Sequence, residues 1–457
     1  YLSRYIDERM ISMEKKNVVV LDIISLTEEH LNDAELTPNI RKLLENGQQA
    51  KIKPVFPAVT GSMQATYITG TSPAEHGIIC NGLPNWDTKE ITMWNQTMLP
   101  VEGKKIWEKL KEEDLTAETA VLFWQFSKLS TADYVVTPAP IHLDKKTIMW
   151  CDSKPRGLYE KLRGKYGEFD LKSFWGPLSS VKSSEWILDA AIDVLEEYKP
   201  RLSLVYLPNI DYNAQRFGPE SEAAKRSIKE IDSLIGNFVE QLEERNLKEQ
   251  TRLVILSEYN FKTVNRPIFI NQTLNKEGYV AIKHVENMDF LDLEMSKAFA
   301  LADHQLAHVY IQDSRDIGVV KEILERTPGI AEVWGEEEKR VHKINHELSG
   351  QLIAIAEPDS WFVYYWWLND EQAPEFAYNV DIHRKPGYDP VELFVNSKTF
   401  QIPLEPERIK GSHGLPAKDK GDYVSLVVTG RDFELPDTLE ATEVHDLLLK
   451  LVGNGER

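Results

Sequence analysis

The sequence has few cysteines and no apolar run of membrane-spanning length. Cys80 and Cys151 are the two cysteines among 457 residues. They are too few for a disulfide framework, and their spacing is not that of a metal site. The most apolar segment, residues 361–368, is far shorter than the roughly 20 residues that a membrane-spanning helix needs. We therefore expect neither a disulfide-stapled scaffold nor a membrane span.

The sequence also lacks an excess of positive charge. It carries 53 Lys and Arg residues against 73 Asp and Glu residues, which gives a net charge of −20. This balance argues against a nucleic-acid scaffold or an anionic membrane surface as the main partner. A small phosphorylated substrate is still compatible, because one metal or basic site can reverse the sign locally. The oligomeric state stays open.

The first residues show no signal-peptide pattern. Residues 1–16 are rich in charged side chains, and Met13 lies shortly before the first apolar run. We interpret residues 1–12 as an extension and expect a cytoplasmic protein.

Four apolar, strand-like runs each end at a polar residue. The runs are residues 17–22, 55–60, 202–211 and 253–258, and their terminal polar residues are Asp22, Thr60, Asp211 and Glu258. Short apolar runs of this kind are typical of buried strands in a parallel sheet. Ligands of such sheets bind at the carboxyl ends of the strands. Hard oxygen ligands and a hydroxyl at one edge favour a metal-assisted site for phosphate-like esters.

Helical segments alternate with these runs, among them residues 183–198 and 221–242, each with a regular apolar face. This alternation predicts an α/β fold with a mainly parallel sheet and helices on both faces. Residues 261–349 differ in character and contain a β-α-β succession, which predicts a small α+β inserted cap. We expect a core of residues 13–260 and 350–457, with a strand at residues 350–356 that returns to the core.

Two polar residues near the second run are candidates for chemistry. Thr60 is a nucleophile in one interpretation and only the N-cap of the following helix in the other. Asn81 either donates a hydrogen bond to a phosphoryl oxygen or serves as a turn residue before Gly82.

Histidines and basic residues later in the chain give further candidates. His413 lies between glycines on a loop, which favours a ligand over a core residue. His304 and His308 are four apart, a spacing that occurs in metal sites and also by chance. Arg384 and Lys385 either bind a substrate anion or belong to a solvated turn. For residues 361–367 we favour buried core over an aromatic platform.

Taken together, these motifs resemble the alkaline phosphatase superfamily, in its type I phosphodiesterase/nucleotide pyrophosphatase branch. The resemblance follows the family order over about residues 17–430. Its carriers are VVVLD at 18–22, FPAVT at 56–60, YITG at 67–70, PAEHGIICN at 73–81, YLPNID at 206–211, RFGP at 216–219 and GSHG at 411–414.

The resemblance implies two divalent ions, usually Zn²⁺, with Mn²⁺ or Mg²⁺ as alternatives. It implies one ion on Asp22, Thr60 and Glu258, a second on Asp211 and His413, and a phosphate contact from Asn81. Three positions depart from the family pattern. Gln215 and Tyr259 stand where the family has histidines, and Glu258, which can still bind a metal, stands where it has an aspartate. His304, His308 and His383 are then candidate replacement ligands.

The sequence therefore predicts a metal-dependent hydrolase of phosphodiesters, pyrophosphates or phosphonates that acts through a phospho-threonine intermediate at Thr60. The alternative is a degenerate, non-catalytic binding protein that keeps the phosphatase fold. Metal content distinguishes the two hypotheses.

Overall fold

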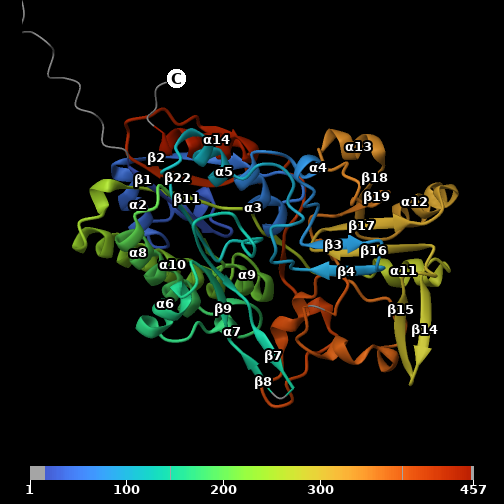
Figure 1. The fold of residues 1–457 in the computed structure, drawn as a ribbon. Coiled ribbons are helices and arrows are strands. Elements are labelled where there is room, and N and C mark those ends of the chain that lie inside the picture. The colour runs from blue at the N-terminus through green and yellow to red at the C-terminus, as the bar shows by residue number, and fades with distance from the viewer. Residues whose placement is uncertain (1–15, 145, 383, 454–457) are drawn as a thin grey trace, which may run out of the picture.

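The computed structural model describes residues 16–144, 146–382 and 384–453. A nine-stranded sheet forms the larger unit, in the order β23-β2-β22-β11-β1-β10-β5-β6-β9 (Figure 1). The strands are β1 (Asn17–Ile23), β2 (Gly47–Lys53), β5 (Thr119–Leu122), β6 (Tyr134–Pro138), β9 (Cys151–Lys154), β10 (Leu202–Leu207), β11 (Thr251–Leu256), β22 (Val424–Thr429) and β23 (Thr438–Glu440). The central strands β11, β1, β10, β5 and β6 run parallel, and β22 and β9 are antiparallel to their neighbours. The predicted α/β class is confirmed.

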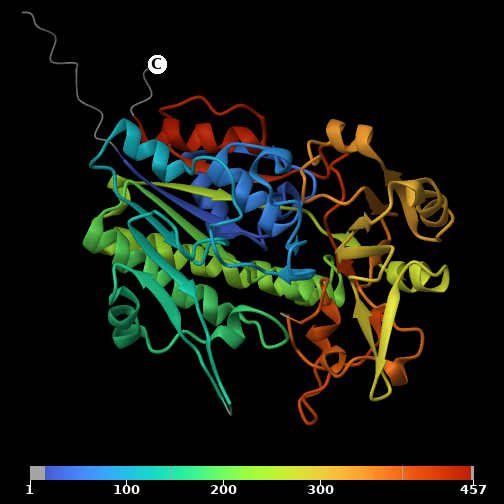
Figure 2. The ribbon, with the colours of Figure 1, turned by 45° about the vertical axis from the view of Figure 1, so that its right-hand side comes forward.

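Helices cover both faces of this sheet. On one face α14 (Ala441–Val452) packs against α3 (Thr60–Thr69) and β1. On the other face α10 (Glu222–Glu244) packs against α8 (Val181–Tyr198) and α2 (Pro38–Glu45). Figure 2 shows the sheet between these two helical layers. No helix in the described part of the chain has the length and apolar character that crossing a bilayer demands.

The register of the three central strands brings polar residues to one edge. Val18 to Leu21 are fully buried on β1, because helices cover both sides of the sheet and leave no solvated face. Asp22 pairs with Tyr206 of β10 and with Leu256 of β11. The residues that follow β10 and β11 therefore emerge beside Asp22, as the parallel arrangement predicts.

One of the four predicted strands does not form. Residues 54–59 lead into α3 without pairing to the sheet, and β2 lies just before them. Pro54 and Pro57 lack the backbone N–H that a central strand must donate. The predicted helix start at Thr60 is nevertheless found, since α3 begins at that residue.

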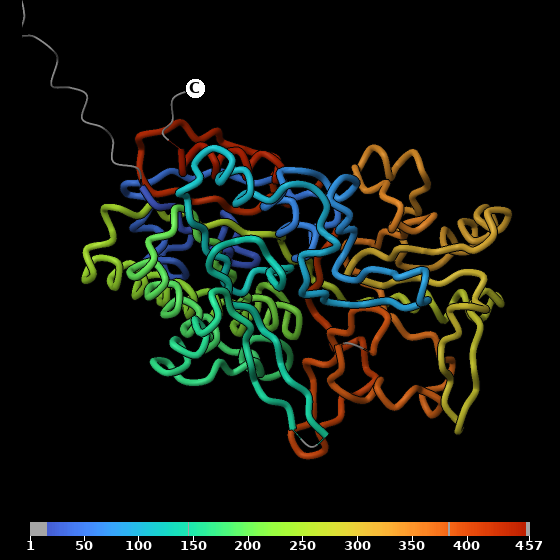
Figure 3. Tube along the Cα trace, in the orientation of Figure 1, coloured from blue at the N-terminus to red at the C-terminus, as the bar shows by residue number. Residues whose placement is uncertain are grey.

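The smaller unit is built on a four-stranded antiparallel sheet in the order β16-β17-β19-β18. Its strands are β16 (Ala298–Asp303), β17 (Leu306–Ile311), β18 (Ile330–Trp334) and β19 (Leu352–Ala356), and α11 (Ile270–Lys276), α12 (Ile317–Glu325) and α13 (Glu336–Val341) accompany them. Figure 3 shows this unit, in yellow and orange, beside the larger one. The predicted succession of strand, helix and strand corresponds to β17, α12 and β18.

The smaller unit extends beyond the predicted boundary. The strand expected to rejoin the core at residues 350–356 is β19, which pairs with β17 and β18. A buried apolar strand suits either sheet, so its sequence does not say which sheet takes it. A second hydrophobic cluster continues to Ile409 and includes residues 361–367. The buried-core interpretation of that aromatic segment is confirmed, and we propose that the unit ends well beyond residue 349.

Candidate active site

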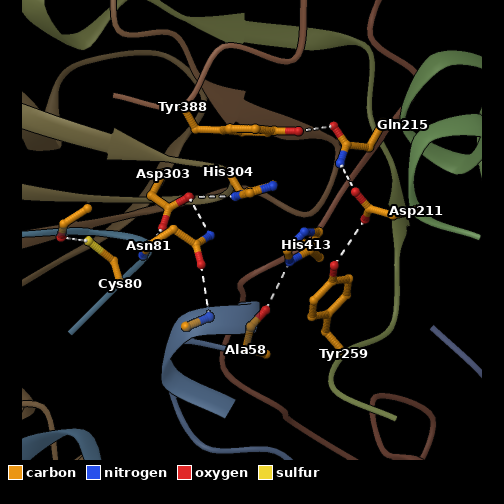
Figure 4. Close-up of polar contacts among 12 residues, drawn as sticks. Ala58, Cys80, Asn81, Asp211, Gln215, Tyr259, Asp303, His304, Tyr388 and His413 are labelled. Carbon is orange, nitrogen blue, oxygen red and sulfur yellow. Dashed lines mark hydrogen bonds and ion pairs between the residues drawn. The ribbon is translucent and has the colours of Figure 1, made fainter. Parts of the chain in front are cut away.

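A cleft at the carboxyl edge of the large sheet faces the smaller unit. Thr60, Asn81, Asp211, His304 and His413 all contribute to its lining. Aromatic side chains complete the wall: Trp94, Trp175, Tyr212, Tyr259 and Tyr388. The sequence predicted the first five as site residues, and the fold brings them together from both units. Figure 4 shows four of them, Asn81, Asp211, His304 and His413.

Asp22 and Glu258 form a fully buried carboxylate pair at this edge. The Gln64 amide nitrogen on α3 donates to both, at 3.0 Å to Asp22 and 2.7 Å to Glu258. The Gln64 oxygen accepts from the backbone N–H of Gln125 at 2.6 Å, which fixes the direction of the amide. One oxygen of each carboxylate, Asp22 Oδ1 and Glu258 Oε2, is buried without a hydrogen-bond partner.

Burial dominates the electrostatics of this pair. It raises the pKa of Asp22 well above its usual range, and the neighbouring Glu258 raises it further. Burial also raises the pKa of Glu258 to about 7, opposed by hydrogen bonds from Asp22, Thr60 and Gln64. Two carboxylates in a site without water ionise together only if a cation compensates them.

Thr60 occupies the first position of α3 and is almost fully buried. Its side chain makes no N-cap hydrogen bond, and Val59 is the N-cap residue. The helix-cap interpretation of Thr60 therefore has no support. Thr60 is instead one of the groups that lower the pKa of Glu258, which places it beside the carboxylate pair.

Asn81 is fixed beside Thr60 by three hydrogen bonds. Its Oδ1 accepts from the Gly61 N–H at 2.9 Å, while its backbone N–H and Nδ2 donate to Asp303 at 2.8 and 3.2 Å. One N–H of the Nδ2 amide remains for another acceptor. Asp303 was not among the predicted site residues, although it directly precedes His304.

His304 reaches the cleft from the turn between β16 and β17. Its Nδ1 lies 2.6 Å from Asp303 Oδ1. Its ring stacks on Tyr388 with the centroids 4.0 Å apart, and it contacts the His413 ring at 3.9 Å with the planes tilted by 38°. Asp303 thus holds Asn81 and His304 at the same time (Figure 4).

Asp211 opens α9 (Asp211–Phe217) and uses both carboxylate oxygens within the protein. Its Oδ1 accepts from the Tyr259 hydroxyl at 3.0 Å, and its Oδ2 accepts from Gln215 Nε2 at 2.7 Å. The Tyr388 hydroxyl donates to Gln215 Oε1 at 2.6 Å. Burial raises the pKa of Asp211 to about 6, and the neighbouring His304 opposes the rise.

His413 is buried on the loop after β21 (Gly411–Ser412). Its Nδ1 lies 2.9 Å from the Ala58 carbonyl oxygen, so this nitrogen carries the proton of the neutral ring. Tyr259 stacks on the ring at 3.5 Å with planes 2° apart, and Phe261 contacts it edge-on. Burial, reinforced by His304, lowers the pKa of His413 well below its usual value.

His308 does not belong to the site. On β17 its Nε2 contacts the Ile79 carbonyl at 3.2 Å, and its Nδ1 accepts from the Gly350 N–H at 3.3 Å. Both ring nitrogens are thus used by the backbone, so a metal has no lone pair to bind. His383, the other predicted replacement ligand, lies outside the described residues.

Arg384 and Lys385 also differ from their predicted role. The Lys385 ammonium contacts Asp389, Glu392 and the Asn379 carbonyl, which uses all three of its donors. A buried ammonium requires such compensation. Arg384 is exposed, pairs with Asp381 and lies over Phe376. Neither side chain lines the cleft.

In the described ranges no three His, Cys, Asp or Glu side chains converge as a ready-made metal site. The Asp22–Glu258 pair and Asp211 differ in how well they suit a bound cation. The Asp22–Glu258 pair offers unpartnered buried oxygens, which fit a divalent ion. Asp211 has neutral hydrogen-bond donors on both oxygens instead.

Two solved structures share the fold of this chain. Phosphonoacetate hydrolase from Sinorhizobium meliloti, in complex with phosphonoacetate, has a TM-score of 0.64 at 15% identity and covers 96% of each chain. Murine ectonucleotide pyrophosphatase/phosphodiesterase 5 has a TM-score of 0.61 at 15% identity, over 96% of this chain and 95% of the murine one.

The family model of type I phosphodiesterase/nucleotide pyrophosphatase matches residues 18–389, and the chain belongs to this family. A Schizosaccharomyces pombe uncharacterized pyrophosphatase/phosphodiesterase is 23% identical over 277 residues, which are 57% of this chain and 48% of that protein. Human ectonucleotide pyrophosphatase/phosphodiesterase family member 1 is 23% identical over 248 residues, 52% of this chain and 23% of the human protein. The chain thus spans less than half the length of these relatives.

Proposed function

We propose that this protein hydrolyses phosphodiesters or phosphonates by nucleophilic attack of the Thr60 hydroxyl on phosphorus. The observation that carries the proposal is that Thr60 and Asn81 line one cleft, with the buried Asp22–Glu258 carboxylate pair beside Thr60. A hydroxyl is a weak nucleophile until a neighbouring group activates it. Thr60 lowers the pKa of Glu258, so its hydroxyl lies beside a carboxylate that can accept its proton.

The remaining side chains of the cleft have distinct tasks in this mechanism. The free N–H of the Asn81 amide donates to a phosphoryl oxygen, and Asp303 keeps that amide in position. The aromatic walls exclude water and contact the organic part of the substrate. Attack by the Thr60 oxygen forms a phospho-threonine and breaks the bond from phosphorus to the leaving group, which takes up a proton and departs. Water then attacks the same phosphorus, breaks the bond to the Thr60 oxygen and restores the hydroxyl, so the phosphorus group leaves as the free acid.

Asp22 and Glu258 are the residues that would hold a divalent ion, through Asp22 Oδ1 and Glu258 Oε2. When bound, such an ion lowers the pKa of the attacking oxygen and neutralises charge on the phosphoryl group. Of the two ions expected from the sequence, this one has the better structural support.

The lining of the cleft favours a substrate with one negative charge. In the described part of the chain, none of the lining residues is Lys or Arg, whereas Trp94, Trp175 and Tyr388 contribute flat apolar surface. A diester or phosphonate ester with an aromatic or apolar group suits this lining. Pyrophosphates and nucleoside triphosphates would bring additional charges that no lining cation compensates.

Solved relatives support the same chemistry. A structure of the murine relative is of an inactive threonine-to-alanine variant in complex with AMP. The bacterial relative is a phosphonoacetate hydrolase crystallised with phosphonoacetate.

The test is turnover of wild type, Thr60→Ala and Thr60→Ser on bis(p-nitrophenyl) phosphate, p-nitrophenyl phenylphosphonate and ATP, each with Mg²⁺, Mn²⁺ and Zn²⁺. We expect Thr60→Ala to lose about 10³-fold or more in kcat, because the covalent step is removed. Thr60→Ser keeps a hydroxyl and should keep measurable turnover. Wild-type turnover in Thr60→Ala would reduce Thr60 to a structural residue.

A further inference from the structure

On the Asp211 side of the cleft, neutral side chains form a connected set of hydrogen bonds around the Asp211 carboxylate. Tyr259 and Gln215 donate to the two carboxylate oxygens of Asp211, and Tyr388 donates to Gln215. We call Asp211, Tyr259, Gln215 and Tyr388 the Asp211 circuit. Figure 4 shows its hydrogen bonds in sequence from Tyr388 to Tyr259.

The rings of His413 and His304 lie between the two tyrosines of the circuit, Tyr259 and Tyr388. The rings follow one another in the order Tyr259, His413, His304 and Tyr388, with centroid separations of 3.5, 3.9 and 4.0 Å. An imidazole binds a metal through a lone pair in the plane of its ring. The planes of His304 and His413 are tilted by 38° to each other, and among the described residues these imidazoles and Asp211 do not form a three-ligand cluster.

Both oxygens of Asp211 and one ring nitrogen of each histidine are engaged elsewhere, which leaves Nε2 of His304 and of His413. Asp211 has a hydrogen bond on each oxygen, His413 Nδ1 is on the Ala58 carbonyl, and His304 Nδ1 is on Asp303. A catalytic zinc ion normally has three protein ligands and an open position. A second ion would have to displace neutral donors that already satisfy the buried Asp211 carboxylate.

The Asp22–Glu258 side has the opposite character. Asp22 Oδ1 and Glu258 Oε2 are buried and unpartnered, and the amide of Gln64 is the donor that the two carboxylates share. Its lining donors are carboxylates and the Thr60 hydroxyl. An oxygen-only set of this kind is typical of Mg²⁺ and Mn²⁺ sites.

We propose that the protein binds one divalent ion per chain, at Asp22 and Glu258, and that the Asp211 circuit replaces a second ion. The inference rests on the metal-assisted function proposed above for the same site. It implies that the substituted residues at positions 215 and 259 form a working alternative to a second metal, and that the site has not simply lost ligands.

The first experiment measures metal stoichiometry without turnover. Wild type, Asp22→Asn and Asp211→Asn are stripped with chelator, titrated with Mn²⁺ by calorimetry, and analysed by mass spectrometry of bound metal. We expect one ion in wild type and in Asp211→Asn, and loss of that ion in Asp22→Asn. Two ions in wild type, or loss of the ion in Asp211→Asn with retention in Asp22→Asn, overturns the inference.

The outcome also separates this inference from the proposed function. An absence of any bound ion in wild type overturns the inference and metal assistance together, while the Thr60 substitutions still test the nucleophile. Two ions overturn the inference and leave the proposed function intact.

The second experiment restores the missing imidazoles. Gln215→His/Tyr259→His should gain a second ion when titrated with Zn²⁺, because position 215 lies one helical turn from Asp211 on α9. The matched control, Gln215→Ala/Tyr259→Phe, removes the same hydrogen bonds without adding ligands and should stay at one ion. Thermal unfolding checks that each variant folds. A folded double-histidine variant that still binds one ion overturns the inference.

Discussion

Asp303 is a buried carboxylate that holds two residues of the cleft from the edge of the smaller unit. Asn81 and His304 both depend on its oxygens for their orientation. We expect Asp303→Asn to lower kcat by about 10- to 100-fold, as loss of an orienting partner commonly does, with little change in KM.

The matched control is Asp289→Asn. Asp289 pairs with His284 in the same manner, at 2.9 Å, on an exposed hairpin remote from the cleft lining. Its substitution should leave kcat and KM unchanged. Equal effects of the two substitutions, or a fall in Asp303→Asn that comes through KM alone, would argue against an orienting role.

His308 makes folding stability depend on pH. Burial lowers its pKa to about 4, so the unfolded chain takes up a proton near pH 6.5 while the folded chain does not. Stability is therefore complete above the unfolded pKa and falls as the pH falls toward about 4. At pH 5 the loss is about 2 kcal/mol by linkage.

Urea unfolding of wild type and His308→Gln at pH 7.5 and pH 5 measures the contribution of His308 to the pH dependence of the free energy of unfolding. The variant is less stable than wild type at pH 7.5, because it loses backbone contacts. Between pH 7.5 and pH 5, however, its free energy of unfolding should fall by about 2 kcal/mol less than that of wild type. Parallel losses in the two proteins would refute the assignment to His308.

At the residue scale, the sequence predicted the polar residues that end an apolar run. It did not predict the residues that hold site residues in place by hydrogen bonds. Asp22, Asp211 and Glu258 follow strands whose register brings them to one edge. Gln64 and Asp303 have no such signal, because their roles come from contacts across 42 and 222 residues. The histidine pair at 304 and 308 looked equivalent in sequence, yet one lies in a turn and the other in a strand.

At the scale of elements, β21 connects two parts of the site that are far apart in sequence. A Cβ at Gly411 would lie 2.2 Å from the backbone oxygen of Ala214 on α9. This close approach brings His413 toward Asp211. We expect Gly411→Ala to lower the free energy of unfolding by about 1–3 kcal/mol, as overpacking does, and to lower turnover.

Gly164→Ala is the control for that change. Gly164 lies within α6 (Leu158–Tyr166), and a Cβ there meets nothing within 4 Å. It should raise the free energy of unfolding by about 0.5–1 kcal/mol through helix propensity and leave turnover unchanged. Denaturant unfolding of both variants gives the comparison. A neutral Gly411→Ala would show that the backbones can separate without consequence.

Elements with strong periodicity were predictable, and those whose pairing depends on distant partners were not. α8 and α10 were expected within a few residues of their bounds, because each presents a regular apolar face. The run at residues 55–59 has the apolar content of a strand, but its prolines exclude it from a ladder. β19 was expected as a strand and is one, in the other sheet.

At the scale of the molecule, the cleft lies between two hydrophobic cores. Thr60 and Asp211 come from the larger unit, and Asp303 and His304 come from the smaller one. A ligand that contacts both sides should therefore stabilise both. We expect orthovanadate to slow amide hydrogen exchange at the start of α3 and at the β16–β17 turn together.

Hydrogen exchange with and without vanadate, followed by mass spectrometry, checks this expectation. The β14 (Ala281–Val285) and β15 (Met288–Asp292) hairpin is the internal reference, since it lies away from the cleft and should not respond. Protection confined to the larger unit would mean that the smaller unit does not take part in binding.

The β16–β17 turn has a consequence for any attempt to make the protein heat-resistant. His304 has a φ of +59°, a left-handed conformation that costs a side-chain-bearing residue about 1–2 kcal/mol and costs glycine almost nothing. A library enriched by heat challenge alone would be drawn to smaller residues at this position, at the expense of the imidazole. Selection for heat resistance and selection for catalytic activity are thus expected to favour different residues at position 304.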